Sequence, residues 1–417
     1  MDEVNISLFS MLSSISNLIN ILDDKATMHQ EQVAYISLRI AKEFGMKQNE
    51  INELIIATSL HDIGAFSLDE RLELLDFEVN GRLNHSEIGA ALLGQFQYFE
   101  QISKIIKYHH LDWNYGKANL TEDDQVPISS HLLHLADRIA VLIDPSKNIL
   151  GQKGRIIEKI RANSKARFNP ELVDQFLSLA DKEEFWLSTV TPDLIKRNLI
   201  REMGTEDLRL NIDQLLDLSK IFSKIIDYRS KFTLNHSYGV AVTAEEVAKL
   251  MGWSNYQGKK IRIAGYLHDL GKLAVATEIL EKPGRLSEAE VNIIKVHTFY
   301  TYYILDPIDQ LSDIKEWAAF HHERLDGKGY PFHHTGKRLS EGSRIMAVVD
   351  VFTAVTEDRP YREGMKKGEV IAILSSMAEN NALDQNIVDI VVDNYEQINS
   401  LRIEAQQRSL REYSNLL

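Results

Sequence analysis

The chain has 417 residues, of which 44% are hydrophobic and 26% charged, shares typical of a folded globular protein rather than a disordered or membrane protein. Its length predicts two domains, because one hydrophobic core rarely organises so many residues. A net charge of −14 disfavours binding to a nucleic-acid polymer, since Lys and Arg supply most of the energy of that binding. With no Cys, the chain can form neither disulfides nor thiolate metal sites.

The amino-terminal segment Met1–Val4 lacks the basic region of a signal peptide. No uninterrupted apolar run approaches the ~20 residues of a membrane span. We therefore expect a cytoplasmic protein with no membrane partner.

Helical periodicity dominates the chain from its first half to its second. Apolar residues recur at helical spacing at Val33, Ile36, Ile40 and Phe44, and less strictly at Val240, Val242, Val247 and Leu250. Lead helices are expected over Val4–Leu22 and Leu208–Tyr228. Alternating strand patterns are scarce and Pro residues are few, so the sequence predicts an all-α fold.

An internal repeat relates the two halves. The segment AKEFG, residues 41–45, matches AKLMG, residues 248–252, at an offset of 207. The same offset relates His29 to His236, His61 to His268, Asp62 to Asp269 and Gly64 to Gly271. Offsets of 212 and 213 relate His85 to His297, His109 to His321, His110 to His322 and Asp137 to Asp350. We therefore predict two tandem helical domains, at 1–205 and 206–417.

The second half carries the donors of a metal centre. Five imidazoles and two carboxylates recur there, ligand types suited to iron, manganese, nickel or zinc. They are His236, His268, Asp269, His297, His321, His322 and Asp350. Seven donors exceed the needs of one ion, so we expect two divalent ions with Asp269 reaching both. A hydroxide held between such ions would attack phosphorus, which predicts phosphoester hydrolysis.

Two motifs carry a family resemblance. Residues 266–272, YLHDLGK, resemble the HD motif, and residues 321–331, HHERLDGKGYP, resemble the HD-GYP signature. Between and after them, Glu281–Gly284, His297, Asp350–Phe352 and Arg359–Arg362 follow in the family's order, so that the resemblance covers about 212–394.

The resemblance implies two tandem HD-fold domains and a phosphodiesterase that opens a bacterial cyclic dinucleotide, cyclic di-GMP or 3′3′-cyclic GMP-AMP. It implies that the seven residues are metal ligands, with iron or manganese first and nickel or zinc as alternatives. Asp269 and Lys272 would be catalytic residues, with Lys272 holding the scissile phosphate, and Arg359 and Arg362 would contact substrate phosphates. Fixed cations near a transferring phosphoryl group stabilise its charge.

Two positions depart from the family pattern. Phe232 stands where some members carry a Glu that binds a third metal, so we expect two ions. Thr353 stands where many members carry an Asp, which leaves the proton donor to the leaving oxygen unassigned.

The first half keeps the metal-type residues but loses other parts of the motif. A second metal site is expected from His29, His61, Asp62, His85, His109, His110 and Asp137. Ala65 replaces the Lys, and the stretch Leu111–Gly116 only faintly resembles the GYP loop. We expect a domain that regulates, stabilises or mediates dimerisation. His131, His134, His333 and His334 have no counterpart in the repeat and are expected to be structural or solvated.

Two other functions are consistent with the pattern. One is a nucleotide-sensing scaffold without turnover, which the intact ligands and Lys272 disfavour. The other is a mononucleotide phosphohydrolase, which the GYP signature disfavours. The arrangement of an HD-like domain before an HD-GYP domain favours cyclic GMP-AMP slightly over cyclic di-GMP. A homodimer or a signalling-protein partner is a further expectation.

Overall fold

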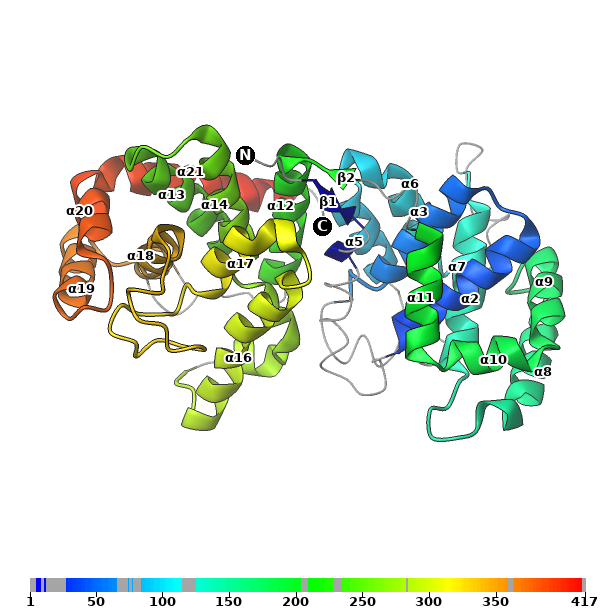
Figure 1. Ribbon diagram of the computed structural model, residues 1–417. Helices are drawn as coiled ribbons and strands as arrows, with labels where there is room; N and C mark the ends of the chain where they lie inside the picture. The colour runs from blue at the N-terminus through cyan, green and yellow to red at the C-terminus, as the bar shows by residue number, and fades with distance from the viewer. Residues whose placement is uncertain are drawn as a thin grey trace. The chain divides into compact units, whose positions relative to one another are not determined.

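The computed structural model describes residues 5–8, 11–12, 28–65, 74, 77, 84–114, 125–203, 209–228, 235–282, 284–358 and 363–414. These residues are mainly helical, as the sequence predicts, with one short pair of strands among them (Figure 1). The chain forms two compact units, one from Asp23 to Leu208 and one from Arg209 to Leu417 together with Met1–Leu22. We call them the N-terminal unit and the C-terminal unit.

The helices of the N-terminal unit begin with α2 and end with α11. Their bounds are α2 His29–Phe44, α3 Gln48–Leu60, α5 Asn84–Leu93, α6 Glu100–Lys107, α7 Ile128–Val141, α8 Lys153–Ala162, α9 Pro170–Ala180, α10 Glu183–Thr189 and α11 Pro192–Met203. Short 3-10 turns, η1 Gln97–Phe99 and η3 Ile149–Gly151, lie between them. Helix α2 packs against α3, α7, α9 and α11, so it forms the centre of this unit.

The C-terminal unit has the same core and further helices after it. Its elements are β1 Ile6–Ser7, β2 Arg209–Leu210, α12 Ile212–Tyr228, α13 His236–Leu250, α14 Asn255–Leu267, η4 Leu270–Ala274, α15 Thr277–Leu280, α16 Glu288–Leu305, η5 Asp309–Leu311, α17 Ser312–Ala319, α18 Glu341–Thr356, α19 Lys367–Glu379, α20 Gln385–Asp393 and α21 Tyr395–Ser414. Helix α13 packs against α14, α18 and α21.

The internal repeat is present in the structure, because α2, α3, α5, α6 and α7 correspond in order to α13, α14, α16, α17 and α18. A matching glycine follows both central helices: Gly45 is the C-cap of α2, and Gly252 follows Met251, the C-cap of α13. Gly45 has φ +82° and Gly252 has φ +85°, a left-handed conformation that glycine adopts without a steric penalty. At the start of each following helix a side chain three residues on accepts from the N-cap amide: Glu50 from Lys47 in α3 and Gln257 from Ser254 in α14, where the Ser254 hydroxyl also completes a capping box.

A second matching glycine brings the metal-type residues close together. A Cβ atom on Gly271 would lie 1.9 Å from the carbonyl oxygen of His297, and one on Gly64 would lie 2.1 Å from that of His85. Only glycine therefore allows the turn after His268 and Asp269 to approach α16 so closely. The same close approach exists in both units.

The predicted helical stripes are mostly buried. Val33, Ile36 and Ile40 are fully buried in α2, and Phe44 is partly exposed at its end. In α13, by contrast, Leu250 is exposed to 36%. The less regular apolar spacing predicted for residues 240–250 therefore includes one residue that faces solvent.

The first residues differ from the expected organisation. Strand β1 pairs antiparallel with β2, with Ile6 opposite Leu210, so residues 1–22 group with the C-terminal unit rather than with the first half. Two residues of the expected lead helix Val4–Leu22 thus form a strand, and most of that helix lies outside the described residues, as does the expected boundary at 205. The second lead helix is present as α12.

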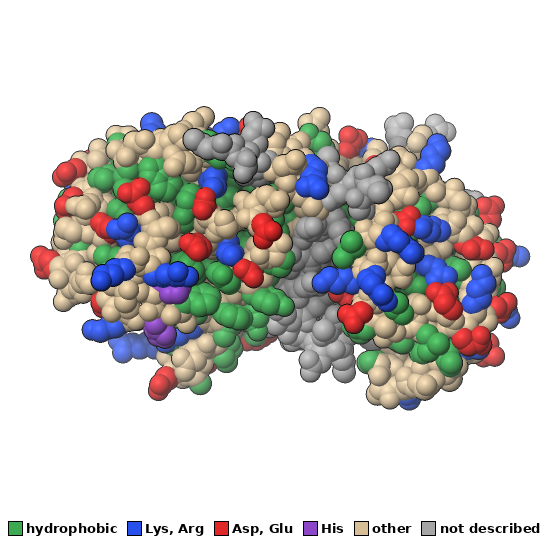
Figure 2. Space-filling model, in the orientation of Figure 1, with side chains coloured by type: hydrophobic (Ala, Val, Ile, Leu, Met, Phe, Trp, Pro, Cys, Tyr) green, Lys and Arg blue, Asp and Glu red, His purple; other side chains and the backbone are tan. Residues whose placement is uncertain are grey.

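Two surface properties bear on partners. No described helix is long and apolar enough to cross a bilayer. Figure 2 shows acidic and basic side chains interspersed on the visible face of both units.

Candidate metal centres

The structure brings together all seven metal-type residues of the C-terminal unit, although they come from different elements. His236 begins α13, His268 and Asp269 follow α14, His297 lies on α16, His321 and His322 follow α17, and Asp350 lies on α18. Their donor atoms form three overlapping groups, each within 4.8 Å: His236, His268 and Asp350; His268, Asp269 and His321; His297, His321 and His322. We call this set the C-terminal cluster.

The two carboxylates lie between the imidazoles. The Nε2 atom of His236 is 3.0 Å from Oδ1 of Asp350. The two oxygens of Asp269 face different rings, with Oδ2 at 3.3 Å from Nε2 of His268 and Oδ1 at 3.5 Å from Nε2 of His297. This arrangement suits a carboxylate that serves two ion positions.

Backbone carbonyls orient three of the imidazoles. The Nδ1 atoms of His268, His297 and His321 each lie within hydrogen-bond distance of the carbonyl oxygen three residues earlier, at 2.8, 2.7 and 2.7 Å. An Nδ1–H donated to a carbonyl leaves the Nε2 lone pair directed into the cluster. The Nε2 atom of His268 is buried and makes no hydrogen bond of acceptable geometry, although Asp269 is near. Such a nitrogen fits a metal ligand.

The charges in the C-terminal cluster are strongly perturbed. Burial acts to raise the pKa of Asp269, but His268 and Lys272 outweigh it and hold that pKa well below its usual range. Burial lowers the pKa of His297 to about 3. It also acts to lower the pKa of His236, but Glu357 and Asp350 raise that pKa to about 10. Ionised carboxylates and neutral imidazoles are the forms that bind metal.

Lys272 lies at the edge of the C-terminal cluster. Its Nζ atom is 2.5 Å from Oδ2 of Asp269, and its side chain is 18% exposed. It therefore places a positive charge beside the carboxylate that faces both sets of imidazoles. The other predicted phosphate contacts, Arg359 and Arg362, lie outside the described residues, as does Phe232.

The N-terminal unit assembles its seven counterparts in the same way. Their donor atoms form two groups within 4.8 Å: His29, His61 and Asp137; Asp62, His85, His109 and His110. We call this set the N-terminal cluster. Its contacts follow the same plan, with His29 Nε2 at 3.1 Å from Asp137 Oδ1 and His61 Nε2 at 3.1 Å from Asp62 Oδ2. The carbonyls of Thr58 and Ile106 orient His61 and His109.

The N-terminal cluster differs where the sequence indicates. Ala65, at the position of Lys272, is fully buried, and the side chain of Asp62 is 15% exposed against 3% for Asp269. After His110, the backbone amides of Trp113 and Asn114 donate to the carbonyls of residues 167 and 166. Tyr115 and Gly116, the rest of the faint GYP match, lie outside the described residues.

Comparisons with known proteins match part of each unit to an HD domain model. Residues 27–142 match the HD domain family, and residues 220–387 match a second HD domain family. The chain contains two HD domains. Each match includes the whole cluster of its unit.

Several curated proteins are similar to this pair of HD domains. The chain is 29% identical over 415 residues to 3′3′-cGAMP-specific phosphodiesterase 1 of Vibrio cholerae, covering 96% of this chain and 95% of that protein. It is 31% identical over 289 residues to 3′3′-cGAMP-specific phosphodiesterase 3 of the same organism, covering 69% and 61%. A cyclic di-GMP phosphodiesterase of Pseudomonas aeruginosa is 35% identical over 175 residues, covering 42% and 41%.

A solved structure shares the fold. The crystal structure of a cyclic GMP-AMP-specific phosphodiesterase from Vibrio cholerae superimposes with a TM-score of 0.62 at 22% identity. The match covers 94% of this chain and 98% of the other. The all-α architecture of two HD domains is therefore confirmed.

Sequence reasoning missed two carboxylates behind His236 in the second HD domain. Glu357, which ends α18, is buried, and its two oxygens lie 3.1 and 3.2 Å from Nδ1 of His236. Asp227 on α12 accepts hydrogen bonds from the Ser237 hydroxyl and amide, and burial raises its pKa to about 7. The signal for Glu357 was its place two helical turns after Asp350, on the same face of α18.

Glu323 binds the end of the GYP segment, by which we mean residues 321–334 of the second HD domain. The two oxygens of Glu323 accept from the amides of Phe332, at 2.7 Å, and His334, at 3.0 Å. The Tyr330 ring centroid is 4.9 Å from that of His322. The GYP segment therefore lies beside the C-terminal cluster, with Tyr330 next to His322.

Position 353 does not offer an obvious proton donor. Thr353 is fully buried, and its hydroxyl oxygen has no hydrogen-bond partner among the described residues. The proton donor remains unassigned.

The four histidines outside the repeat divide into two kinds. His131 and His134 are buried in the first HD domain, and the His134 ring centroid lies 5.8 Å from that of His110. His333 is exposed and His334 is partly exposed. All four lie outside the metal-type groups found among the described residues.

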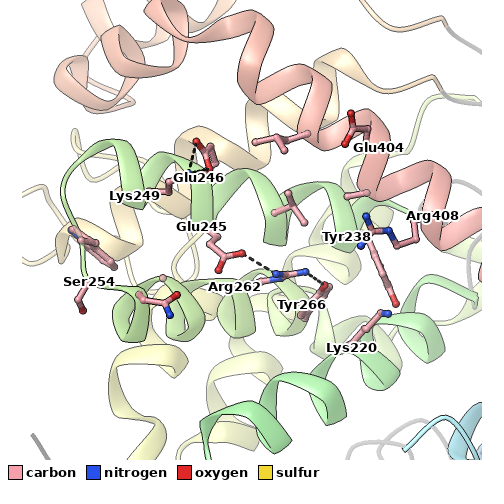
Figure 3. Close-up of a pocket in the computed structure, with 16 residues that line it drawn as sticks. Lys220, Tyr238, Glu245, Glu246, Lys249, Ser254, Arg262, Tyr266, Glu404 and Arg408 are labelled. Atoms are coloured by element: carbon pink, nitrogen blue, oxygen red, sulfur yellow. Dashed lines mark hydrogen bonds and ion pairs between the residues drawn. The ribbon is translucent and has the colours of Figure 1, made fainter.

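A separate cavity of about 560 Å³ lies between α12, α13, α14 and α21 (Figure 3). Arg262 crosses its floor, donating to Glu245 at 3.0 Å and to the Tyr266 hydroxyl at 3.3 Å. Its described lining residues include none of the seven members of the C-terminal cluster. This cavity is therefore not the metal centre.

Proposed function

We propose that the second HD domain is a metal-dependent phosphodiesterase that opens a bacterial cyclic dinucleotide to a linear dinucleotide. The observation that carries this proposal is the buried cluster of five imidazoles and two carboxylates with Lys272 at its edge. The similarity to curated phosphodiesterases of 3′3′-cGAMP and cyclic di-GMP supports the substrate class.

The donor set fits two divalent transition-metal ions, with iron or manganese proposed first and nickel or zinc as alternatives. His236, His268 and Asp350 would hold one position, and His297, His321 and His322 the other, with Asp269 facing both. Such ions lower the pKa of water and stabilise charge on phosphoryl oxygens. The protein's own part is to orient imidazoles, which the backbone carbonyls do for His268, His297 and His321, and to keep His297 and His321 neutral, which burial does by lowering their pKa.

Lys272 is proposed to bind the scissile phosphate. Asp269 fixes its ammonium group at the cluster, where a positive charge would stabilise negative charge developing on a phosphoryl oxygen. Arg359 and Arg362 are proposed to contact other phosphates of the substrate. Both follow α18, which carries Asp350.

We propose 3′3′-cGAMP ahead of cyclic di-GMP. The relative named for 3′3′-cGAMP matches 96% of this chain, including the first HD domain, whereas the Pseudomonas cyclic di-GMP phosphodiesterase matches 42%. The domain arrangement is thus shared with a 3′3′-cGAMP-specific enzyme. A cytoplasmic location, and a homodimer or signalling-protein partner, are further parts of this proposal.

The first HD domain is proposed to bind metal without efficient turnover. It keeps the seven donors at matching positions, but Ala65 removes the phosphate-binding charge. Metal there would stabilise the domain or serve regulation.

Incubation of the metal-loaded full-length protein with each cyclic dinucleotide, followed by chromatography of the linear products, tests the function. A protein with His268→Ala and Asp269→Ala should lose hydrolysis, whereas one with His61→Ala and Asp62→Ala should keep it. If the first protein kept hydrolysis and the second lost it, the active site would lie in the first HD domain and the proposal would be wrong. Tight binding without product in the wild type would instead favour a nucleotide sensor.

A further inference from the structure

A buried arginine distinguishes the N-terminal cluster from the C-terminal one. Arg138 on α7 is 1% exposed, and both its Nε, at 3.0 Å, and its Nη2, at 2.6 Å, donate to Oδ2 of Asp137. The same Nη2 donates to the carbonyl of Leu74 at 2.8 Å. The guanidinium is therefore fixed on one oxygen of a carboxylate that belongs to the metal-type group.

The C-terminal cluster has an apolar residue at the matching position. Val351 follows Asp350 as Arg138 follows Asp137. The two oxygens of Asp350 face imidazoles: Oδ1 lies 3.0 Å from His236, and Oδ2 lies 3.7 Å from Nδ1 of His322. Asp350 thus has an oxygen toward each side of its cluster.

Arg138 changes both the geometry and the charge of its cluster. Oδ2 of Asp137 accepts two N–H groups from Arg138. Among the described residues, Oδ1 is the oxygen of Asp137 that contacts a histidine, at 3.1 Å from Nε2 of His29. The guanidinium also adds one fixed positive charge within a buried site, where charges are poorly screened. A cation beside Asp137 would therefore meet a partly neutralised ligand and a nearby repelling charge.

The other half of the N-terminal cluster is not affected in this way. Asp62 faces His61 at 3.1 Å and His85 at 3.7 Å, and His85 is 3.4 Å from His109. With His110, this group offers three imidazoles and one carboxylate within 4.8 Å, a set sufficient for one divalent ion.

We propose that Arg138 limits the N-terminal cluster to one tightly bound metal ion, held by Asp62, His85, His109 and His110. The position of His29, His61 and Asp137 binds a divalent ion at least about tenfold more weakly, because the buried guanidinium repels the ion and occupies one oxygen of Asp137. The inference rests on the proposed metal binding by the first HD domain. It makes the two HD domains unequal in metal content, whatever their activity.

The test is equilibrium dialysis of full-length protein against Mn²⁺ with metal analysis. A protein carrying His268→Ala and Asp269→Ala reports on the N-terminal cluster. It should hold one tight ion, with a second only at about tenfold or more higher free Mn²⁺. Adding Arg138→Val, the residue of the C-terminal cluster, should make both positions tight. A protein that also carries His61→Ala and Asp62→Ala gives the residual binding to subtract.

The reciprocal change keeps the test decisive if the Arg138→Val protein does not fold. In a protein with His61→Ala and Asp62→Ala, introducing Val351→Arg should reduce tight Mn²⁺ from two ions to one. Two equally tight ions in the N-terminal reporter protein, or none, would overturn the proposal, as would a folded Val351→Arg protein that keeps two. Hydrolysis by the wild type is measured separately, so failure of the proposed activity leaves this stoichiometry test unchanged.

Discussion

Replacing Glu357 by Gln should weaken metal binding at the C-terminal cluster although Glu357 is not a proposed ligand. Its carboxylate accepts from Nδ1 of His236 at 3.1 and 3.2 Å, and Gln406 donates to the same carboxylate at 3.3 Å. This contact holds the Nδ1 proton in place, so that metal binding displaces only the Nε2 proton, which faces Asp350.

The expected magnitude follows from the kind of hydrogen bond. A buried hydrogen bond to a charged group contributes about 1.5–3 kcal/mol. At about 1.4 kcal/mol per factor of ten, this corresponds to roughly 10–150-fold in metal affinity. Glu357→Gln keeps an acceptor and removes the charge, so we expect about tenfold. Glu357→Ala removes both and should approach the upper end.

The assay is a titration of metal-free protein with Mn²⁺ in competition with a chelator, followed by hydrolysis at saturating metal. Glu341→Gln is the matched control. Glu341 begins the same helix α18, but it is exposed, and among the described residues its carboxylate accepts from the Trp253 indole rather than from a metal-type residue. The control should bind metal as the wild type does. Equal metal affinity for Glu357→Gln and Glu341→Gln would refute the reasoning.

Three further outcomes are expected. Gly271→Ala would place a Cβ atom 1.9 Å from the His297 carbonyl oxygen, so it should abolish hydrolysis and lower the melting temperature. Gly64→Ala, with a similar clash in the first HD domain, should lower the melting temperature but leave hydrolysis detectable. An equal loss of hydrolysis in the two variants would contradict a single catalytic domain. Lys272→Ala should keep the metal content measured by elemental analysis but reduce kcat by about 10²–10³-fold, because it removes only a phosphate-stabilising charge; loss of both metals would contradict that role. Because the pKa of His236 is raised to about 10, that imidazole is protonated at pH 7 without metal, so loading should release a proton and apparent affinity should rise with pH below 10. Calorimetry in buffers of different ionisation enthalpy measures this release, and a release of zero would contradict it.

Spacing along the chain was enough to predict the metal-type residues of each half and their assembly into one cluster per domain. Each predicted histidine lies at the start or end of a helix or on a helix face, and the repeat offsets place equivalent residues on equivalent elements. Because the two HD domains fold alike, the motifs of one identify the donors of the other. Lys272 could likewise be placed beside Asp269, because residues three apart in a helical turn lie on the same side.

The groups that contact these metal-type residues from the outside could be found only from the packing of the helices. Glu357 reaches His236 across 121 positions of sequence, and β1 joins the C-terminal unit by pairing with a strand about 200 residues later. Arg138 adjoins Asp137 in sequence, but the structure is needed to show that its guanidinium turns back onto that carboxylate while it also donates to the carbonyl of Leu74. Short-range spacing fixes where a ligand lies on its helix. The partners that set its proton, charge and affinity come from elements that meet only when the helices pack.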